Sequence, residues 1–249
     1  MELALVVLVA IVALLVGAGL NHLADRLPMR QRIDIPPECR YCLTLWPVSG
    51  WVATWAYLVG HSRCAACGAA IPVRKPLVEI VNMLGWVSLY QSRGPSLHFA
   101  LGAFYICIFL LVLITDLEHR LILNVIILPA VIVALLGAFL PGPPTPESAI
   151  IGGAFGFLFF WFVAWIGRGA MGAGDVKLAA FIGLVVGFPN VVIALLFGIV
   201  AGGVTALILV LLRIKTLKSY IPYGPFLVFG GVLLAFFGPL VKQLFMAGA

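Results

Sequence analysis

Two aspartates at the edges of long apolar runs are the residues of this chain best suited to chemistry. Asp116 lies in the segment TDLEHR at 115–120, and Asp175 lies in GAGDVK at 172–177. An ionised carboxylate at membrane depth costs roughly 2.5–3.5 kcal/mol even on the mildest insertion scale. A chain with only 9 acidic residues and 63% hydrophobic residues would not keep such groups there for solubility. The two positions therefore suggest a carboxylate pair that activates water.

The expected chemistry of the pair follows from mutual repulsion. At about 4 Å and an effective dielectric constant near 20, two carboxylates repel by roughly 4 kcal/mol, so they share one proton over a useful pH range. The ionised member takes a proton from water, which attacks a scissile carbonyl. The protonated member donates a hydrogen bond to the carbonyl oxygen. The sequence does not assign these two roles to one aspartate or the other.

Each aspartate also has a simpler interpretation when taken alone. Asp116 could be a solvated residue that caps the next helix, and Asp175 could cap the helix that it precedes. Gly172 and Gly174 favour the catalytic interpretation of Asp175, because glycines allow an extended substrate strand to approach closely. Lys177 either tunes the pair or extends to the membrane interface. We therefore predict a substrate-binding loop that contains Gly172, Gly174 and Lys177.

Four cysteines form the strongest local pattern in the chain. Cys39, Cys42, Cys64 and Cys67 have the spacing C-x2-C-x21-C-x2-C, in which two pairs can surround one tetrahedral zinc ion. Disulfides are the alternative, but they are rare in a reducing cytoplasm, where the topology below puts this segment. We expect a structural zinc ion, because four thiolates leave no open position for catalysis.

The composition indicates an all-α membrane protein that crosses the bilayer several times. Its mean hydropathy is +1.19 and 10% of its residues are charged, whereas about 25% is typical of soluble domains. The net charge of +6 does not indicate nucleic-acid binding, because no basic patch interleaved with aromatic residues appears. We predict about eight transmembrane helices, at residues 3–24, 77–92, 97–115, 121–140, 148–167, 176–188, 190–212 and 222–244. The second and sixth are short and need shielding by their neighbours.

Basic residues predict how the chain is oriented. The segment 25–76 holds seven of the 15 Lys and Arg residues, and the connections near 116–120, 168–177 and 213–218 hold more. The alternate connections are poor in charge. By the positive-inside rule the basic segments are cytoplasmic and both termini lie outside. The first helix is expected to be an anchor rather than a cleaved signal peptide. Asp116 and Asp175 then both lie at the cytoplasmic boundary of the membrane.

Taken together, these motifs resemble the type IV prepilin peptidases, which are intramembrane aspartic peptidases of the GxGD kind. The match includes GAGD at 172–175 with the following Lys177, Asp116 in the first-aspartate position, Asn124 eight residues later, and IPYGPF at 221–226. The stretches PLVE at 76–79 and LNHLADRLP at 20–28 resemble the bacterial N-terminal module of the family. The similarity covers nearly the whole chain. GxGD alone is a weak signal, but the set is specific.

The resemblance implies an endopeptidase of the bacterial inner membrane that cleaves the basic leaders of prepilins and pseudopilins. Bacterial members carry similarly paired cysteines. They often also methylate the new N-terminus with S-adenosylmethionine. Here the sequence departs from the family pattern, because residues 51–59 are apolar and His61-Ser62-Arg63 replaces a basic tripeptide. The departure lies in the region to which the resemblance assigns methyl transfer, so it bears on the implied methyltransferase activity more than on the peptidase activity. A peptidase without methyl transfer is therefore an open alternative.

These inferences give a division of the chain into a first transmembrane helix (1–24), a cytoplasmic loop with paired cysteines (25–76) and a peptidase core (77–249). A proton- or cation-coupled transporter is the alternative from another class, although its carboxylates should lie near the midplane of the bilayer. Glu79 opens a helix, where its charge is favourable, or it lines the substrate site. The sequence does not determine the oligomeric state.

Overall fold

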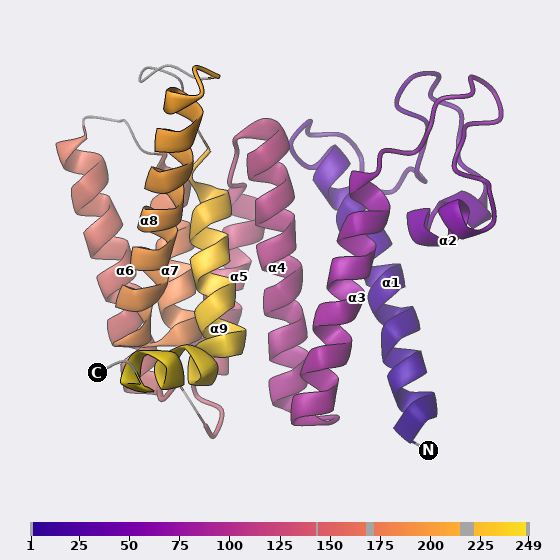
Figure 1. Cartoon of the computed structure of the whole chain (residues 1–249). Coiled ribbons are helices and arrows are strands. Elements are labelled where there is room, and N and C mark those ends of the chain that lie inside the picture. The colour runs from indigo at the N-terminus through magenta and orange to yellow at the C-terminus, as the bar shows by residue number, and fades with distance from the viewer. Residues whose placement is uncertain (1, 143, 168–171, 215–221, 248–249) are drawn as a thin grey trace. The chain divides into compact units, whose positions relative to one another are not determined.

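The structure is a computed structural model that describes residues 2–142, 144–167, 172–214 and 222–247, with side chains up to 238. Helices, turns and two isolated β-bridges make up these described residues (Figure 1). The α-helices are α1 (Glu2–Arg26), α2 (Ala53–Leu58), α3 (Arg74–Arg93), α4 (Leu97–His119), α5 (Asn124–Gly137), α6 (Pro146–Ile166), α7 (Ala173–Val186), α8 (Asn190–Leu211) and α9 (Gly224–Ala247). A short 3₁₀ helix, η1, covers Val48–Gly50.

The helices confirm the all-α membrane class. Four of them, α1, α4, α6 and α8, are long and apolar enough to cross a bilayer, and α5 and the first part of α9 are shorter apolar helices. Several boundaries differ from the predicted ones. The helix predicted at 97–115 continues to His119, and the helix predicted at 176–188 begins at Ala173. Both aspartates therefore lie inside helical turns and not beyond them.

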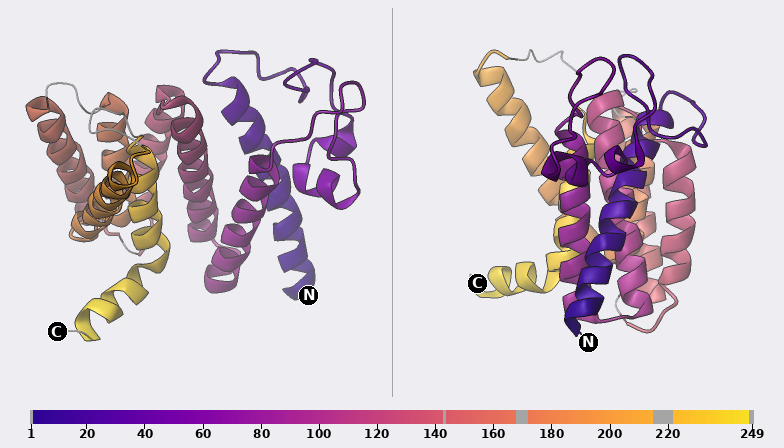
Figure 2. Two further views of the ribbon diagram at one scale, coloured as in Figure 1. Left: turned by 45° about the horizontal axis from the view of Figure 1, so that its top comes forward. Right: turned by 90° about the vertical axis from the view of Figure 1, so that its right-hand side faces the viewer.

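The chain divides into two compact units, Met1–Leu111 and Val112–Ala249. In the first unit α1 packs along α3. Gly17 allows this close approach, since a Cβ there would lie 2.8 Å from the Cα of Glu79. Asn82, which is fully buried on α3, donates a 2.8 Å hydrogen bond to the Ala13 carbonyl of α1. Figure 2 shows the loop between α1 and α3, with α2 inside it. The short helix α2 was not predicted, because it is only six residues long.

The second unit is built around α7. Nearly every residue of α7 after Asp175 is buried, and α5, α6, α8 and α9 all pack against it. Its backbone lies directly on α6, because a Cβ on Gly183 would lie 2.1 Å from the Gly152 carbonyl oxygen. Small residues with this spacing allow helices to approach closely in membranes. The burial explains how so short a helix is shielded from lipid.

Candidate active site and cysteine centre

Asp116 lies in the last turn of α4 and is only 4% exposed. Its carboxylate accepts a hydrogen bond from the backbone N–H of Gly224, at the start of α9. Its Oδ2 has no hydrogen-bond partner among the described residues. Asp116 does not cap the helix that follows it, because α5 begins at Asn124 and its N-cap is Leu123. The alternative that Asp116 is only a solvated junction residue is therefore wrong.

Asp175 is the third residue of α7 and is 5% exposed. The N-cap of the helix is Gly172, so the interpretation of Asp175 as the N-cap is wrong. Its carboxylate instead reaches back and accepts a hydrogen bond from the Gly172 backbone N–H. This is one half of a capping box, and it holds the carboxylate over the N-terminal end of α7. An anion is favourable at that end of a helix.

The fold brings the two carboxylates together within the second unit. The Asp175 carboxylate interacts electrostatically with that of Asp116 and with the Tyr223 hydroxyl. Within the described part of the chain, neither aspartate forms an ion pair with Lys or Arg. Because burial weakens screening by water, two buried carboxylates in this arrangement repel each other. That the two groups share one proton, as expected from the sequence, stays a prediction.

Of the predicted substrate-binding loop, Gly174 and Lys177 lie within α7, and Gly172 immediately precedes this helix with an extended backbone. Gly172 is the N-cap, while Gly174 and Lys177 lie in the first two turns of the helix. A Cβ on Gly174 would lie 2.7 Å from the Cβ of Ile122, so glycine lets α7 approach the segment before α5. The Lys177 ammonium donates a 2.7 Å hydrogen bond to Oδ1 of Asn124. Together these contacts fix the N-terminal end of α7 against that of α5.

Tyr223 and Gly224 are the site residues that sequence reasoning missed. They immediately precede and open α9, and they reach Asp175 and Asp116 respectively. Their only signal in the sequence is the stretch IPYGPF at 221–226, which indicates a family resemblance without a role. Ile221 lies outside the described residues. The carboxylate pair is therefore bordered by the ends of α4, α7 and α9 together.

Glu79 does not open its helix, because α3 begins five residues earlier, at Arg74. It is 1% exposed. Its carboxylate accepts hydrogen bonds from the backbone N–H groups of Ala53, at 2.9 Å, and Thr54, at 2.7 Å. These are the first two residues of α2. Glu79 therefore ties the short helix of the loop to α3.

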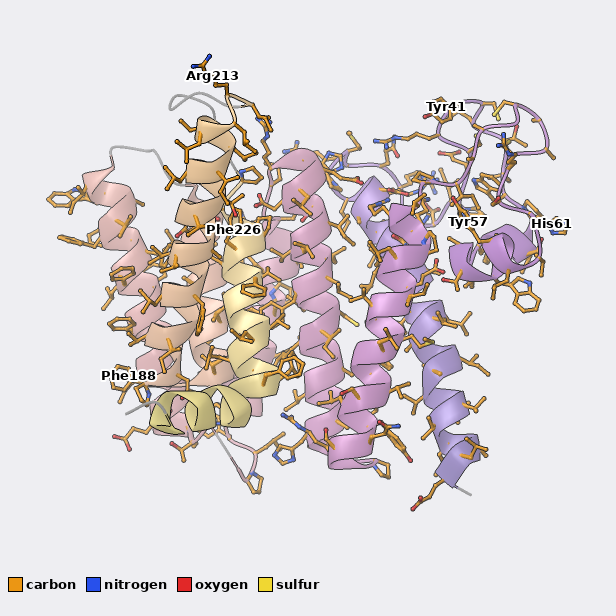
Figure 3. The ribbon with its side chains drawn as sticks, viewed as in Figure 1. Tyr41, Tyr57, His61, Phe188, Arg213 and Phe226 are labelled. Atoms are coloured by element: carbon orange, nitrogen blue, oxygen red, sulfur yellow. The ribbon has the colours of Figure 1, made fainter. Side chains whose placement is uncertain are left out.

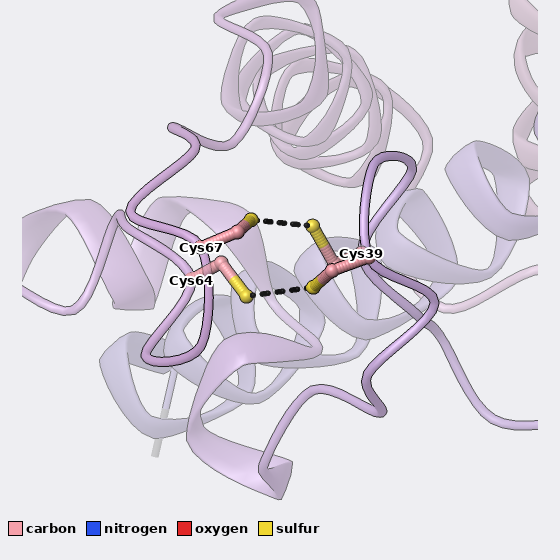
Figure 4. Close-up of side chains that lie close together, drawn as sticks. Cys39, Cys64 and Cys67 are labelled. Carbon is pink, nitrogen blue, oxygen red and sulfur yellow. Dashed lines mark hydrogen bonds between the residues drawn. The ribbon is translucent and has the colours of Figure 1, made fainter.

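The four cysteines form one cluster, as their spacing predicts (Figure 4). Their Sγ atoms all lie within 4.8 Å of one another, with Cys39 3.6 Å from Cys67 and Cys42 3.5 Å from Cys64. All four are free thiols, since a disulfide would need about 2.05 Å. Tetrahedral zinc with Zn–S bonds of about 2.3 Å requires sulfur atoms roughly 3.8 Å apart. The cluster is therefore positioned to bind a metal ion and fits zinc.

Two similar turns present the cysteines. In each pair, the residue after the second cysteine donates its backbone N–H to the carbonyl of the first: Leu43 to Cys39 at 3.0 Å and Gly68 to Cys64 at 2.8 Å. Both donors have positive φ, 58° at Leu43 and 73° at Gly68. The two turns are therefore built alike, although only one of them has the glycine that this backbone conformation favours.

The thiols differ in acidity. Hydrogen bonds with Thr44, first with its side chain and then with its backbone, lower the pKa of Cys42 to about 6. The backbone N–H of Ala69 lowers the pKa of Cys67, but desolvation and the neighbouring thiols outweigh it and raise that pKa to about 12. Metal ligation requires thiolates, so a cation that binds all four sulfur atoms must displace protons.

Two family profiles match the chain. The type IV leader peptidase family matches residues 103–207, and the bacterial peptidase A24 N-terminal domain matches residues 11–92. The first region contains both aspartates and the second contains all four clustered cysteines. No solved structure matches the chain significantly.

Similar curated proteins match most of the chain. A prepilin leader peptidase/N-methyltransferase of Burkholderia pseudomallei (strain 1026b) is 30% identical over 228 residues, which cover 86% of this chain and 71% of the relative. Proteins of the same name from Pseudomonas aeruginosa and Bacillus subtilis (strain 168) are each 26% identical, and cover 98% and 95% of this chain and 94% and 96% of the relatives. With both profiles and this coverage, the chain belongs to the type IV leader peptidase family.

Proposed function

We propose that this protein is an intramembrane aspartic endopeptidase that removes the basic leaders of type IV prepilins and pseudopilins. The observation that carries the proposal is the pair of buried carboxylates, Asp116 and Asp175, which interact across the ends of α4 and α7. The relatives named above as prepilin leader peptidases support the choice of substrate.

The surroundings of the pair suit an exchange of one proton. Each carboxylate accepts one backbone N–H, from Gly224 for Asp116 and from Gly172 for Asp175, so the ionised form of either one is supported. The ionised member would remove a proton from water, and the resulting nucleophile would attack the scissile carbonyl. The protonated member would donate its hydrogen to the carbonyl oxygen. As the tetrahedral intermediate breaks down, the carboxyl that took the water proton would pass it to the leaving amine, and the other carboxylate would recover its proton from the hydroxyl of the intermediate, which returns the pair to its starting state.

We place the site at the cytoplasmic face of the bacterial inner membrane. The proposed topology has eight membrane helices, namely α1 and α3–α9, with both termini outside. It rests on the excess of Lys and Arg in the segment 25–76 and in the connections on the same side. Within the second unit, Figure 1 shows the end of α4 and the starts of α5, α7 and α9 at one end of the bundle. A prepilin leader that remains in the cytoplasm would meet the carboxylates there.

The cysteine cluster is proposed to hold a structural zinc ion. Four sulfur ligands close the coordination sphere, so the metal would stabilise the loop and would not take part in cleavage. The loop needs such support, because its own buried core consists of Ala53, Ala56 and Ile71, with Trp46 packed against them.

Cleavage of a purified prepilin by the protein in detergent tests the peptidase. We expect Asp116→Asn and Asp175→Asn each to abolish cleavage while the variants remain membrane-inserted, because asparagine keeps the size but cannot ionise. Cleavage by either variant at the wild-type rate would exclude the pair as the catalyst. If wild type leaves the prepilin uncut but proteoliposomes show a proton or cation flux that depends on Asp116, the transporter alternative is correct.

Methyl transfer is the second proposed activity. The relatives carry N-methyltransferase in their names, and the N-terminal profile covers residues 11–92. The apolar segment 51–59 departs from the family pattern in this region. Transfer of a radiolabelled methyl group from S-adenosylmethionine to cleaved pilin decides between the two alternatives. Cleaved pilin without label would mean that the protein is a peptidase only.

A further inference from the structure

The loop between α1 and α3 has its large and small apolar residues in unusual places. Ala53 and Ala56 of α2 are buried, at 1% and 0% exposed, and pack on Ile71. Much larger side chains point outward: Trp55 is 56% exposed and Leu58 77%. A loop surrounded by water normally does the reverse, because burial of the larger apolar side chains contributes more free energy. The arrangement fits an apolar environment outside the protein.

We call the exposed large apolar residues of η1, α2 and the residues next to them the α2 face. It consists of Val48, Trp51, Trp55, Tyr57, Leu58 and Val59, each 37% exposed or more. The polar atoms of two of its aromatic rings are bonded inside the loop. The Trp51 indole N–H donates to the Trp46 carbonyl at 3.1 Å, and the Tyr57 hydroxyl donates to the Ile71 carbonyl at 2.6 Å. The α2 face therefore needs no hydrogen bonds from water at these two rings.

Glu79 fixes the position of α2 along the axis of α3. Its carboxylate, buried in the second turn of α3, holds the N-terminal end of α2 through Ala53 and Thr54. Figure 1 shows α2 beside the ends of α1 and α3 that the loop joins, and Figure 3 labels Tyr57 on α2. The start of α3, to which Glu79 ties α2, also exposes a large apolar side chain, Leu77, at 59%. Both α2 and the start of α3 therefore present large apolar side chains to their surroundings.

The basic residues of the loop and of the start of α3 suit a lipid headgroup layer. Arg40 and Arg63 are exposed in the two cysteine turns, and neither forms an ion pair with the described residues. Arg74 and Lys75 lie at the start of α3 beside Asp25. Basic side chains near a membrane surface attract anionic lipids, and Trp and Tyr are enriched at the same depth.

We infer that the α2 face lies in the headgroup region of the membrane and anchors the cysteine loop to the bilayer. The occupant of the surface is thus lipid and not a second protein. The anchor would keep the metal-binding cluster at the membrane surface, where it would otherwise depend on a loop with a very small core. This inference does not depend on the peptidase activity.

Tryptophan fluorescence in nanodiscs tests the inference. The double variant Trp51→Phe, Trp55→Phe keeps the surface apolar, and the difference between its emission and that of wild type isolates these two rings. With anionic lipids that carry bromine near the top of the acyl chains, we expect this difference emission to be strongly quenched and blue-shifted. Aqueous acrylamide should quench it weakly.

Two control variants set the scale of the measurement. Trp46→Phe removes a ring that is partly buried against the core of the loop, so lipid should quench its difference emission less than that of the α2 face. Trp165→Phe removes a ring that is 68% exposed on α6, a candidate membrane span, and should be quenched by lipid. Unchanged zinc content would show that the double variant is folded. The inference would be overturned if acrylamide quenched the difference emission of Trp51 and Trp55 strongly and the brominated lipid did not. It would also be overturned if neither reagent quenched this emission, because protein would then cover the α2 face.

Discussion

The backbone N–H of Gly224 donates a hydrogen bond to the carboxylate of Asp116, and a larger residue at this position would press on that carboxylate. A Cβ on Gly224 would lie 2.6 Å from Oδ2 and 3.0 Å from Cγ of Asp116. The start of α9 is thus packed directly onto one proposed catalytic group. The contact joins two segments that are more than 100 residues apart in the chain.

Replacement of this glycine should impair cleavage strongly. In Gly224→Ala the new methyl group must push the Asp116 carboxylate or α9 aside, and a displacement of about 1 Å can cost on the order of 100-fold in rate. We expect a loss of about this size in kcat for prepilin cleavage. Gly203→Ala is the matched control, because a Cβ at Gly203 meets nothing within 4 Å. Equal rates for the two variants would mean that Gly224 does not position Asp116.

The hydrogen bond from Lys177 to Asn124 should support the geometry of the pair more weakly. This contact is exposed and 2.7 Å long, and a hydrogen bond of this kind contributes about 1 kcal/mol. Asn124→Leu should therefore lower the cleavage rate by about fivefold, whereas Asn124→Asp keeps an acceptor for the ammonium group and should retain most of the activity. A similar loss in both variants would indicate that Asn124 has another role, such as contact with the substrate.

Zinc binding should depend on pH in a defined direction. Cys67 has a raised pKa of about 12 and stays protonated at neutral pH, whereas Cys42, with a pKa of about 6, is largely ionised. Binding releases the proton from Cys67, so the apparent affinity for zinc should rise as the pH rises from 7 to 9. Below about pH 6 it should fall more steeply, because Cys42 then also binds a proton. Competition with a coloured chelator at several pH values measures this, and an affinity independent of pH would contradict it.

Removal of the metal should act on the loop and not on the carboxylate pair. Metal binding contributes directly to folding when the site does not exist in the unfolded chain. Treatment with a strong chelator, or Cys64→Ser, should make the segment 27–73 sensitive to protease, while α4–α9 remain resistant. If a mass spectrum of the digest shows cleavage in α4–α9 at the same rate, the cluster stabilises more than its own loop.

The two cysteine turns offer a matched pair of substitutions. Leu43 has φ 58°, and a left-handed conformation costs roughly 1–2 kcal/mol for a residue with a Cβ. Leu43→Gly should therefore strengthen zinc retention against a chelator by about fivefold. Gly68→Ala should weaken it by a similar factor, since a Cβ there meets nothing within 4 Å and only the backbone conformation is affected. No change in either variant would show that these turns relax without cost.

The sequence by itself determined those features that depend on local pattern. Long apolar runs fixed the helical membrane class, because the backbone in lipid must satisfy its own hydrogen bonds. The spacing of Cys39, Cys42, Cys64 and Cys67 was enough to predict one cluster, since each pair is confined to a single turn. Asp116 and Asp175 stood out because acidic residues next to apolar runs are costly.

Only the tertiary structure decided what surrounds these groups. Gly224 and Tyr223 reach the carboxylate pair because α9 packs beside α7, and no local pattern encodes that contact. Glu79 holds the N-terminal end of α2 from a different helix, so its partners could not be read from its own segment. The aspartates lie inside helices because hydrogen bonds and packing extend α4 and α7 beyond their apolar runs. The apolar pattern of the sequence thus shows where a helix lies. The neighbouring helices determine where that helix ends and which groups its polar residues contact.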